Sequence, residues 1–367
     1  MAPVTTDALP DGWPVLRGWL PFDLNGPARQ HGFFQRARGL QDAEYWLRLI
    51  LMHVGGGLSL EQTVLRAGEL GLTRVSAVAL FKRLRKAQGW LAELTRHLLV
   101  EQERRLGRFG WPYAYRLRVI DATNVQEPGS TGTDLRVHYS IRLPELTCDH
   151  YELTDESGGE KLGRYRFEPG EMVLVDRGYS HRPGVAYVLA AKAQVLVRWN
   201  PGTFPLEDRQ GRPLDLLPRL RALADGQVGD WDVQFVHQAK IYPLRLCALR
   251  KSRLAAERAR RKALRKAQKN GTQAQAEALE LTGYVLVLTS VDRRLLTAKA
   301  VLELYRGRWQ IELVFKRLKS LLEAGHVPKS DDDSAKAWVQ AKILTALLVD
   351  RILLEGRFFS PWGYTLG

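Results

Sequence analysis

The stretch Val301–Leu322 constrains the fold of this chain most strongly, because its pattern predicts one amphipathic helix with an unusual polar side. It contains no proline and one glycine, so several helical turns are expected. At about 100° per residue, its apolar side chains form one arc that should be buried: Leu304, Ile311, Val314, Phe315, Leu318, Leu321 and Leu322. Beside this arc lies a polar group, defined by Tyr305, Arg308, Glu312, Lys316 and Lys319.

This polar group has two interpretations. In the first, Glu312 forms ion pairs with Arg308 and Lys316, one helical turn away on either side. In the second, Glu312 binds a metal ion while the cations hold a phosphate. The spacing favours the second, because Tyr305, two residues, Arg308, three residues, Glu312, six residues, Lys319 resembles the Tyr-Arg-Glu-Lys signature of one branch of DDE transposases. These enzymes move bacterial insertion sequences by cutting and pasting DNA.

Two aspartates that follow apolar runs complete the pattern. Asp121 follows Leu117–Ile120 in the sequence Asp-Ala-Thr, and Asp176 follows Glu171–Val175 in Asp-Arg-Gly-Tyr. We expect each of them to end a strand, where an aspartate is often only a turn or cap residue. Both contexts, however, resemble those of the first two catalytic aspartates of the same transposases. The resemblance therefore implies a catalytic and metal-binding triad of Asp121, Asp176 and Glu312.

The residue types suit the implied chemistry. Phosphodiester hydrolysis needs an activated water and a stabilised leaving 3′ oxygen, and two Mg²⁺ ions about 3.5–4 Å apart supply both. Mg²⁺ prefers carboxylate oxygens, and we expect Mn²⁺ to substitute for it. Asp121 is expected to bridge both ions, with Asp176 and Glu312 completing one site each.

The cations near the acids are expected to hold DNA. An arginine can bind phosphate through two N–H groups, whereas a lysine acts as a point charge. By resemblance, the DNA-phosphate contacts are Tyr305, Arg308, Lys316, Lys319 and Arg177. The freed 3′-OH would then attack target DNA.

The resemblance also implies a hairpin on the transposon end. Closing a hairpin forces a base out of the stack, and an aromatic side chain can receive it or take its place. Trp199 follows the strand Gln194–Arg198, and Trp231 opens a later strand, so both are candidates for this wedge. Trp309 is expected to pack against the core instead.

The chain divides into four parts by its pattern. The resemblance implies an α/β fold with a ribonuclease-H-like catalytic core, which is preceded by a helical N-terminal DNA-binding region and interrupted by a β-strand-rich insertion. We expect the N-terminal region at 1–105, the first part of the core at 106–199, the insertion at 200–282, and the second part of the core, with its Glu312 helix and C-terminal helix, at 283–367.

The N-terminal region should consist of a loose arm over residues 1–40 and then helices. Ser59 and Gln62 form a capping box before one helix, and Ser76 opens a longer basic segment through Leu91. Helix, turn and basic helix are typical of a helix-turn-helix, although a small bundle with a solvated basic face is the alternative.

Two further segments carry clear patterns. Leu135–Leu143 alternates apolar and polar residues, which predicts a half-buried strand. Lys251–Asn270 holds nine lysines and arginines and one glutamate, which predicts a protruding helix or disordered spur that contacts DNA backbone.

Charge and composition agree with a DNA partner. The 55 basic residues exceed the 40 acidic ones, giving a net charge of +15, which favours polyanions. No apolar run reaches the ~20 residues of a membrane span, and no secretory signal is visible. We therefore expect a bacterial cytoplasmic protein that meets the nucleoid through DNA, without a membrane partner. It should bind terminal inverted repeats and target DNA, as a homodimer in the synaptic complex.

Two rival functions stay open at this point. A ribonuclease-H-like nuclease would cut DNA without joining strands. A domesticated transposase would only bind DNA, although the three acids argue against it. Strand-transfer and metal-dependent nicking assays separate the three.

Overall fold

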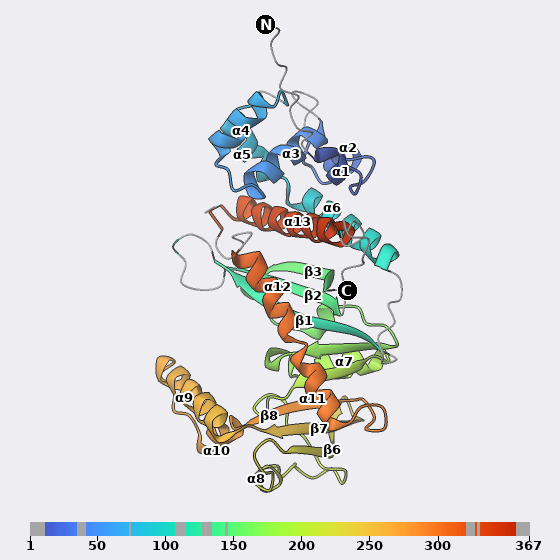
Figure 1. Cartoon of the computed structure of the whole chain (residues 1–367), viewed down its shortest axis with the longest axis vertical. Helices are drawn as coiled ribbons and strands as arrows, with labels where there is room; N and C mark the ends of the chain where they lie inside the picture. Colours follow the sequence, from blue (N-terminus) through green and yellow to red (C-terminus); the bar gives the residue numbers. More distant parts are fainter. Residues whose placement is uncertain are drawn as a thin grey trace.

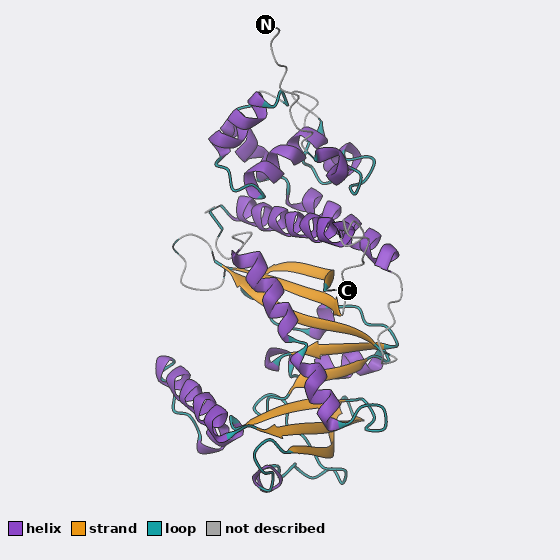
Figure 2. Cartoon of the chain, viewed as in Figure 1, coloured by secondary structure: helices purple, strands orange, loops and turns teal. Residues whose placement is uncertain are grey.

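The fold is built on one mixed sheet of eight strands in the order β3-β2-β1-β4-β5-β8-β7-β6 (Figure 1, Figure 2). The structure is a computed structural model that describes residues 12–34, 42–72, 75–106, 115–126, 129, 134–143, 146–320, 327–328 and 331–356. Its strands are β1 (Arg116–Val125), β2 (Leu135–Leu143), β3 (Thr147–Asp155), β4 (Glu171–Val175), β5 (Gln194–Arg198), β6 (Val228–His237), β7 (Lys240–Arg250) and β8 (Tyr284–Thr289).

The middle of the sheet is parallel and its flanks are antiparallel. β4 pairs in parallel with both β1 and β5, whereas β2 and β8 run antiparallel to their neighbours β1 and β5. All five residues of β4 are buried, as expected for a strand covered on both faces. Alternate side chains enter two cores: Leu174 and Leu196 on one face, Val173 and Val195 on the other.

Strand β2 is more buried than its alternating pattern predicts. His138 and Ser140, expected to face solvent, are fully buried. The prediction was wrong because the chain after β3 folds over this face, where the Gly158 carbonyl accepts a hydrogen bond from Arg136 at 2.9 Å.

The N-terminal part is helical and begins earlier than predicted. Its helices are α1 (Trp13–Arg17), α2 (Asn25–Gln30), α3 (Ala43–Val54), α4 (Leu60–Glu69), α5 (Ala77–Leu84) and α6 (Gln88–Leu106). The prediction of a loose arm was wrong for residues 12–34, because Leu24, Ala28 and Phe33 are buried. The centroid of the Phe33 ring lies 4.6 Å from that of Trp90. The rest of the arm, 1–11 and 35–40, lies outside the described residues.

Helices α4 and α5 form where the sequence predicts a helix, a turn and a second helix. Ser59 and Gln62 form the predicted capping box at the start of α4, and the Ser76 hydroxyl accepts a hydrogen bond from the Ala79 N–H at the start of α5. The prediction of one longer basic segment from Ser76 through Leu91 is wrong, because α5 ends at Leu84 and α6 starts a new helix at Gln88.

Helix α13 (Asp332–Gly356) packs back on the protein as expected. It lies against α6, between the N-terminal helices and the sheet (Figure 1). Asp331 caps it through a hydrogen bond from the Ser334 N–H, so this aspartate run serves the helix end.

The segment 200–282 extends the sheet. Its strands β6 and β7 pair with each other, and β7 pairs with β8, which in turn pairs with β5. The chain forms α8 (Leu217–Arg221) before β6, and it forms α9 (Arg253–Lys269) and α10 (Ala276–Leu281) between β7 and β8. Helix α9 protrudes from the sheet, as the sequence predicted, and buries no residue (Figure 1).

The predicted Val301–Leu322 helix is two helices. α11 (Ala298–Arg306) is followed by α12 (Trp309–Ser320), and the turn between them holds Gly307 and Arg308. The single glycine explains the break, because glycine is the weakest helix former after proline. Ile311 and Phe315 are buried as predicted, while Leu321 and Leu322 lie outside the described residues.

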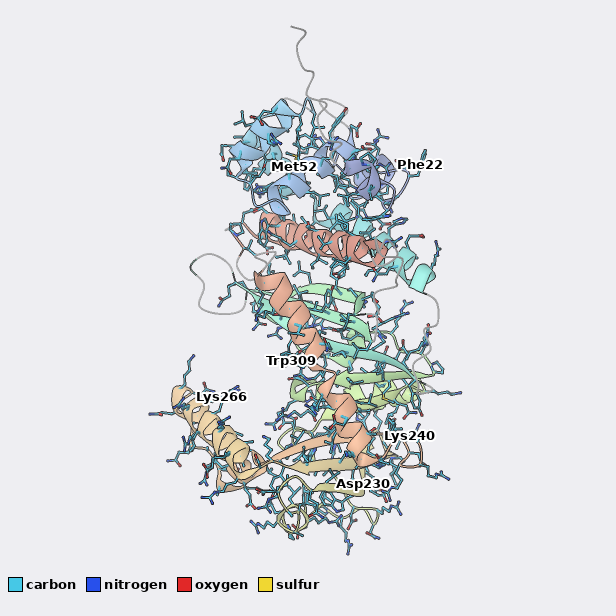
Figure 3. The ribbon with its side chains drawn as sticks, viewed as in Figure 1. Phe22, Met52, Asp230, Lys240, Lys266 and Trp309 are labelled. Carbon is cyan, nitrogen blue, oxygen red and sulfur yellow. The ribbon has the colours of Figure 1, made fainter. Side chains whose placement is uncertain are left out.

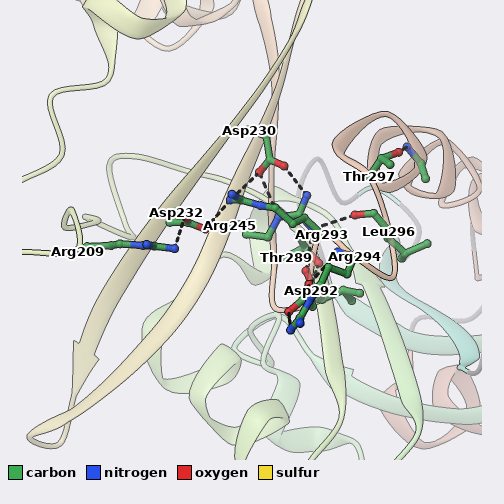
Figure 4. A network of polar contacts seen from close by, with 12 residues as sticks. Arg209, Asp230, Asp232, Arg245, Thr289, Asp292, Arg293, Arg294, Leu296 and Thr297 are labelled. Atoms are coloured by element: carbon green, nitrogen blue, oxygen red, sulfur yellow. Dashed lines mark hydrogen bonds and ion pairs between the residues drawn. The ribbon is translucent and has the colours of Figure 1, made fainter.

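A buried ion-pair network fixes the loop that leads into α11 (Figure 4). The Arg245 guanidinium donates to the Val291 and Leu296 carbonyls at 2.8 and 3.0 Å and pairs with Asp230. Strand β7 thereby holds the segment just before the helix that carries Tyr305. Among the described helices, none is long and apolar enough to cross a membrane.

Candidate active site

Three polar residues lie at one level of the sheet, where β4 and β5 end. The last register pairs at this edge join Ile120 to Val175 and Val175 to Val197. The residues that follow them, Asp121, Asp176 and Arg198, therefore share one row and one face. The carboxyl ends of parallel strands are a common location for ligand sites in α/β proteins.

Asp121 reaches this edge from within its strand. The prediction that it ends a strand was wrong, because β1 continues to Val125 and pairs with β2 over its whole length. Only the parallel partner β4 ends here. Asp121 is thus held by antiparallel pairing on one side and faces the open end of β4 on the other.

Asp176 is fixed by the turn that follows it. Its Oδ1 accepts a hydrogen bond from the Gly178 N–H at 2.6 Å, which caps the short 3₁₀ helix η2 (Arg177–Tyr179). A Cβ at Gly178 would lie 1.6 Å from Oε2 of Glu160. The glycine of Asp-Arg-Gly-Tyr therefore makes room for a second carboxylate.

Glu160 is an acid that the sequence analysis missed. It lies beside Asp176, and both burial and the Asp176 charge raise its pKa. It stands in a Gly-Gly-Glu-Lys loop with no periodic signal, so only the folded chain reveals its position. Three carboxylates, Asp121, Asp176 and Glu160, influence one another at this edge.

The electrostatics favour a cation here. Burial raises the pKa of Asp121 to about 7, and the charges of Asp176 and Glu160 add to that rise, while the Ala122 N–H and Arg308 oppose it. Buried, mutually repelling carboxylates are hard oxygen donors whose charge a divalent ion would neutralise. Asp121 and Asp176 therefore suit a hard metal ion.

Arg308 connects Asp121 to Glu312. Its Nη1 donates to Asp121 Oδ2 at 3.1 Å, and its Nη2 donates to Glu312 Oε1. The predicted i,i+4 ion pair between Arg308 and Glu312 is therefore present. The same guanidinium also pairs with Asp121 of β1, one of the predicted metal ligands. In the described part of the chain, no three histidine, cysteine, aspartate or glutamate side chains converge as a metal site.

The other predicted phosphate contacts lie on α11, on α12 and directly after Asp176. Tyr305 is 7% exposed, burial raises its pKa to about 12, and its hydroxyl has no hydrogen-bond partner among the described residues. Lys316 and Lys319 are exposed on α12, and Arg177 is exposed directly after Asp176.

The tryptophans differ from their predicted roles. Trp199 cannot serve as a wedge as placed, because it is 5% exposed and its indole N–H donates to the Phe204 carbonyl at 2.7 Å. Trp231 is the fourth residue of β6 and packs partly against the core. Trp309, expected in the core, is 57% exposed at the start of α12 (Figure 3), because the break at Gly307 turns it outward.

Comparison with known proteins identifies the family. A family model described as "Transposase DDE domain" matches residues 154–348, a range that contains Asp176 and Glu312 and begins after Asp121. The InsL transposase of insertion sequence element IS186A from Escherichia coli (strain K12) is 33% identical over 359 residues, 96% of each chain. The chain belongs to the DDE transposases of insertion sequences.

Two further transposases and one solved structure are also similar to this chain. The transposase of IS421 from Escherichia coli is 32% identical over 360 residues, 96% of each chain. The transposase of IS231C from Bacillus thuringiensis subsp. berliner is 22% identical over 277 residues, 67% of this chain and 58% of that one. A solved piggyBac transposase synaptic complex with hairpin DNA covers 96% of this chain and 75% of its own, at 10% identity and a TM-score of 0.48.

Family membership sets the general activity. A DDE transposase is an enzyme that acts on DNA and depends on divalent metal, and this holds for the present chain.

Proposed function

We propose that this transposase belongs to the Tyr-Arg-Glu-Lys branch and cleaves transposon ends with Asp121, Asp176 and Glu312. One observation carries the proposal: Asp121 and Asp176 share a row at the end of parallel strands, and Arg308 joins that row to Glu312. A ribonuclease-H-like core over 106–199 and 283–367, with an insertion at 200–282 and a DNA-binding region at 1–105, is part of the proposal.

Asp121, Asp176 and Glu312 would hold two Mg²⁺ ions, or Mn²⁺ in their place. When bound, these ions supply charge neutralisation at the scissile phosphate and lower the pKa of the attacking water. Glu312 would take this role after Arg308 releases it, since the two form an ion pair.

The surrounding residues would orient the DNA. Arg308, once released, can bind phosphate through two N–H groups, and the buried Tyr305 hydroxyl can donate to the same backbone. Lys316, Lys319 and Arg177 add positive charge around the acids. These contacts would place the scissile phosphate against the carboxylates and exclude bulk water from it.

The reaction would proceed from end binding through cleavage to joining of the 3′-OH to target DNA, in a homodimeric synaptic complex. A hairpin intermediate is part of the proposal, with Trp231 as the remaining predicted wedge. The strand-transfer assay tests it: a pre-cleaved end with a free 3′-OH should be joined to plasmid DNA in the presence of Mg²⁺. Nicking without joining would favour the nuclease, and binding without nicking would favour a domesticated DNA-binding protein.

A further inference from the structure

Cations without partners continue the row of acids across the sheet. Arg198 ends β5 at the level of Asp176, and Arg177 follows Asp176 directly. Neither side chain forms a hydrogen bond or an ion pair with another described residue. Two guanidinium groups side by side repel each other, which raises the free energy of the folded chain unless an anion binds near them. Their placement therefore points to a ligand phosphate.

The row extends to the far end of β7. Arg198 pairs with Val287 of β8, and Val287 pairs with Cys247 of β7. Lys251 follows directly on β7, four residues after Cys247, which by strand alternation is the same side of the sheet, and its Nζ donates a hydrogen bond to the Thr282 carbonyl at 2.6 Å. Burial and the charges of Arg198 and Arg177 lower the pKa of Lys251, so the three cations influence one another.

Helix α9 starts two residues after Lys251 and continues the positive charge. Its only acid, Glu257, pairs with Arg253. Seven further cations form no ion pair or hydrogen bond with any residue that the structure describes: Arg258, Arg260, Arg261, Lys262, Arg265, Lys266 and Lys269. A pocket of about 940 Å³ is lined by residues of α9, α10 and the end of β7, with Arg250, Lys251, Arg253 and Arg260 beside Asp225, Glu257 and Glu280.

We propose that Arg177, Arg198, Lys251 and helix α9 form one surface that binds the backbone of the DNA flanking the transposon end. This inference rests on the proposed function. The order of the sheet gives the direction: the N-terminal helices and α13 lie toward β3, whereas α9 lies toward β7 (Figure 1). DNA held by the N-terminal helices, with its scissile phosphate at Asp121, therefore leaves toward α9.

The dimensions fit a short duplex. Four inter-strand steps separate β1 from β7, and at ~4.8 Å each they span ~19 Å, about six base pairs at ~3.4 Å. The 17 residues of α9 add ~25 Å of charged helix. Because dense positive charge binds phosphates wherever they lie, this surface should bind the backbone without reading sequence.

The test compares two DNA substrates. One carries the transposon end alone, and the other adds a flanking duplex of ~15 base pairs, longer than the ~19 Å track. The first variant neutralises α9 through Arg261→Gln, Lys262→Gln and Lys266→Gln, and the second is Lys251→Gln. The matched control is Lys240→Gln at the opposite end of β7 (Figure 3), which removes one exposed charge from the same strand.

The wild-type protein should bind the flanked DNA more tightly than the flankless DNA. The α9 variant should lose that gain and flatten the salt dependence on flanked DNA by ~2–3 units, at ~0.9 per phosphate, while flankless binding stays within twofold. Lys251→Gln should lose part of the gain, and Lys240→Gln none.

Two results would overturn the inference: an unchanged gain from the flank in the α9 variant, or an equal loss on both substrates. Failure of the proposed function looks different, because the wild-type protein would then not cleave the flankless or the flanked end in any metal.

Discussion

Arg308 lies between Asp121 and Glu312 and donates hydrogen bonds to both carboxylates. Its guanidinium neutralises a strand carboxylate and a helix carboxylate at once. A divalent ion at Asp121 would compete with it for the same oxygens. Metal binding and the movement of Arg308 toward DNA phosphate should therefore be coupled.

Replacing Arg308 tests this coupling. Arg308→Ala should tighten Mn²⁺ binding by about five- to tenfold, because a partly buried ion pair worth ~1 kcal/mol no longer has to be broken. Calorimetric titration of Mn²⁺ into protein stripped of metal with a chelator measures the affinity of each variant. The control is Arg306→Ala, which removes an exposed arginine paired with Glu303 on the same helix. Equal or weaker Mn²⁺ affinity in Arg308→Ala contradicts the competition.

His138 gives the fold a pH dependence. Burial, and to a smaller extent the charge of Arg164, lower its pKa to about 4. The unfolded chain takes up the proton near pH 6.5 and the folded chain does not, so stability is full above ~6.5 and falls as the pH drops to ~4, by roughly 3 kcal/mol. In His138→Gln, urea unfolding should lose most of this slope, and an unchanged slope would assign it to other groups.

Single residues were predictable where a motif surrounds them. Asp176 stands in Asp-Arg-Gly-Tyr and Glu312 in a fixed spacing of four side chains, so both could be named from the sequence. Glu160 could not, because only the close approach to Gly178 brings it to the site. Trp309 was wrongly predicted to be buried, because its orientation depends on the helix break at Gly307 and Arg308 directly before it.

At the scale of elements, the loop before α11 is held by buried charge. Arg245 is 6% exposed and satisfies two backbone carbonyls besides Asp230. Arg245→Gln should lower the free energy of unfolding by about 2–4 kcal/mol, because it leaves buried polar groups without partners. Arg209→Gln is the control, since Arg209 pairs with Asp232 of the same network from an exposed position. It should cost under ~1 kcal/mol, and equal losses in urea unfolding would contradict the buried role of Arg245.

The sequence located most strands and helices but misjudged where helices end. Continuous apolar runs identified β4 and β5, and charge density identified α9. Breaks such as Gly307 and the α5–α6 junction depend on how the segments pack, which periodicity does not show. The burial of His138 and Ser140 on one face of β2 was not predicted for the same reason.

For the whole molecule, the order of the strands was the least predictable property. β8 inserts between β5 and β7 although more than 80 residues separate it from β5 along the chain. Nothing local in β6 or β7 indicates that they extend the catalytic sheet. That order places Asp121 and Asp176 between the N-terminal helices and α9, on which the proposed DNA path depends (Figure 1).

The most direct test of the central claim is metal-dependent cleavage of a transposon end by carboxylate variants. Asp121→Asn, Asp176→Asn and Glu312→Gln should each reduce Mg²⁺-dependent cleavage by more than a hundredfold and leave end binding nearly unchanged. Asp332→Asn, at the exposed start of α13 where it pairs with Lys336, should cleave like the wild type. Cleavage within about tenfold of wild type in any of the three, a barrier change of ~1.4 kcal/mol or less, would contradict the assignment.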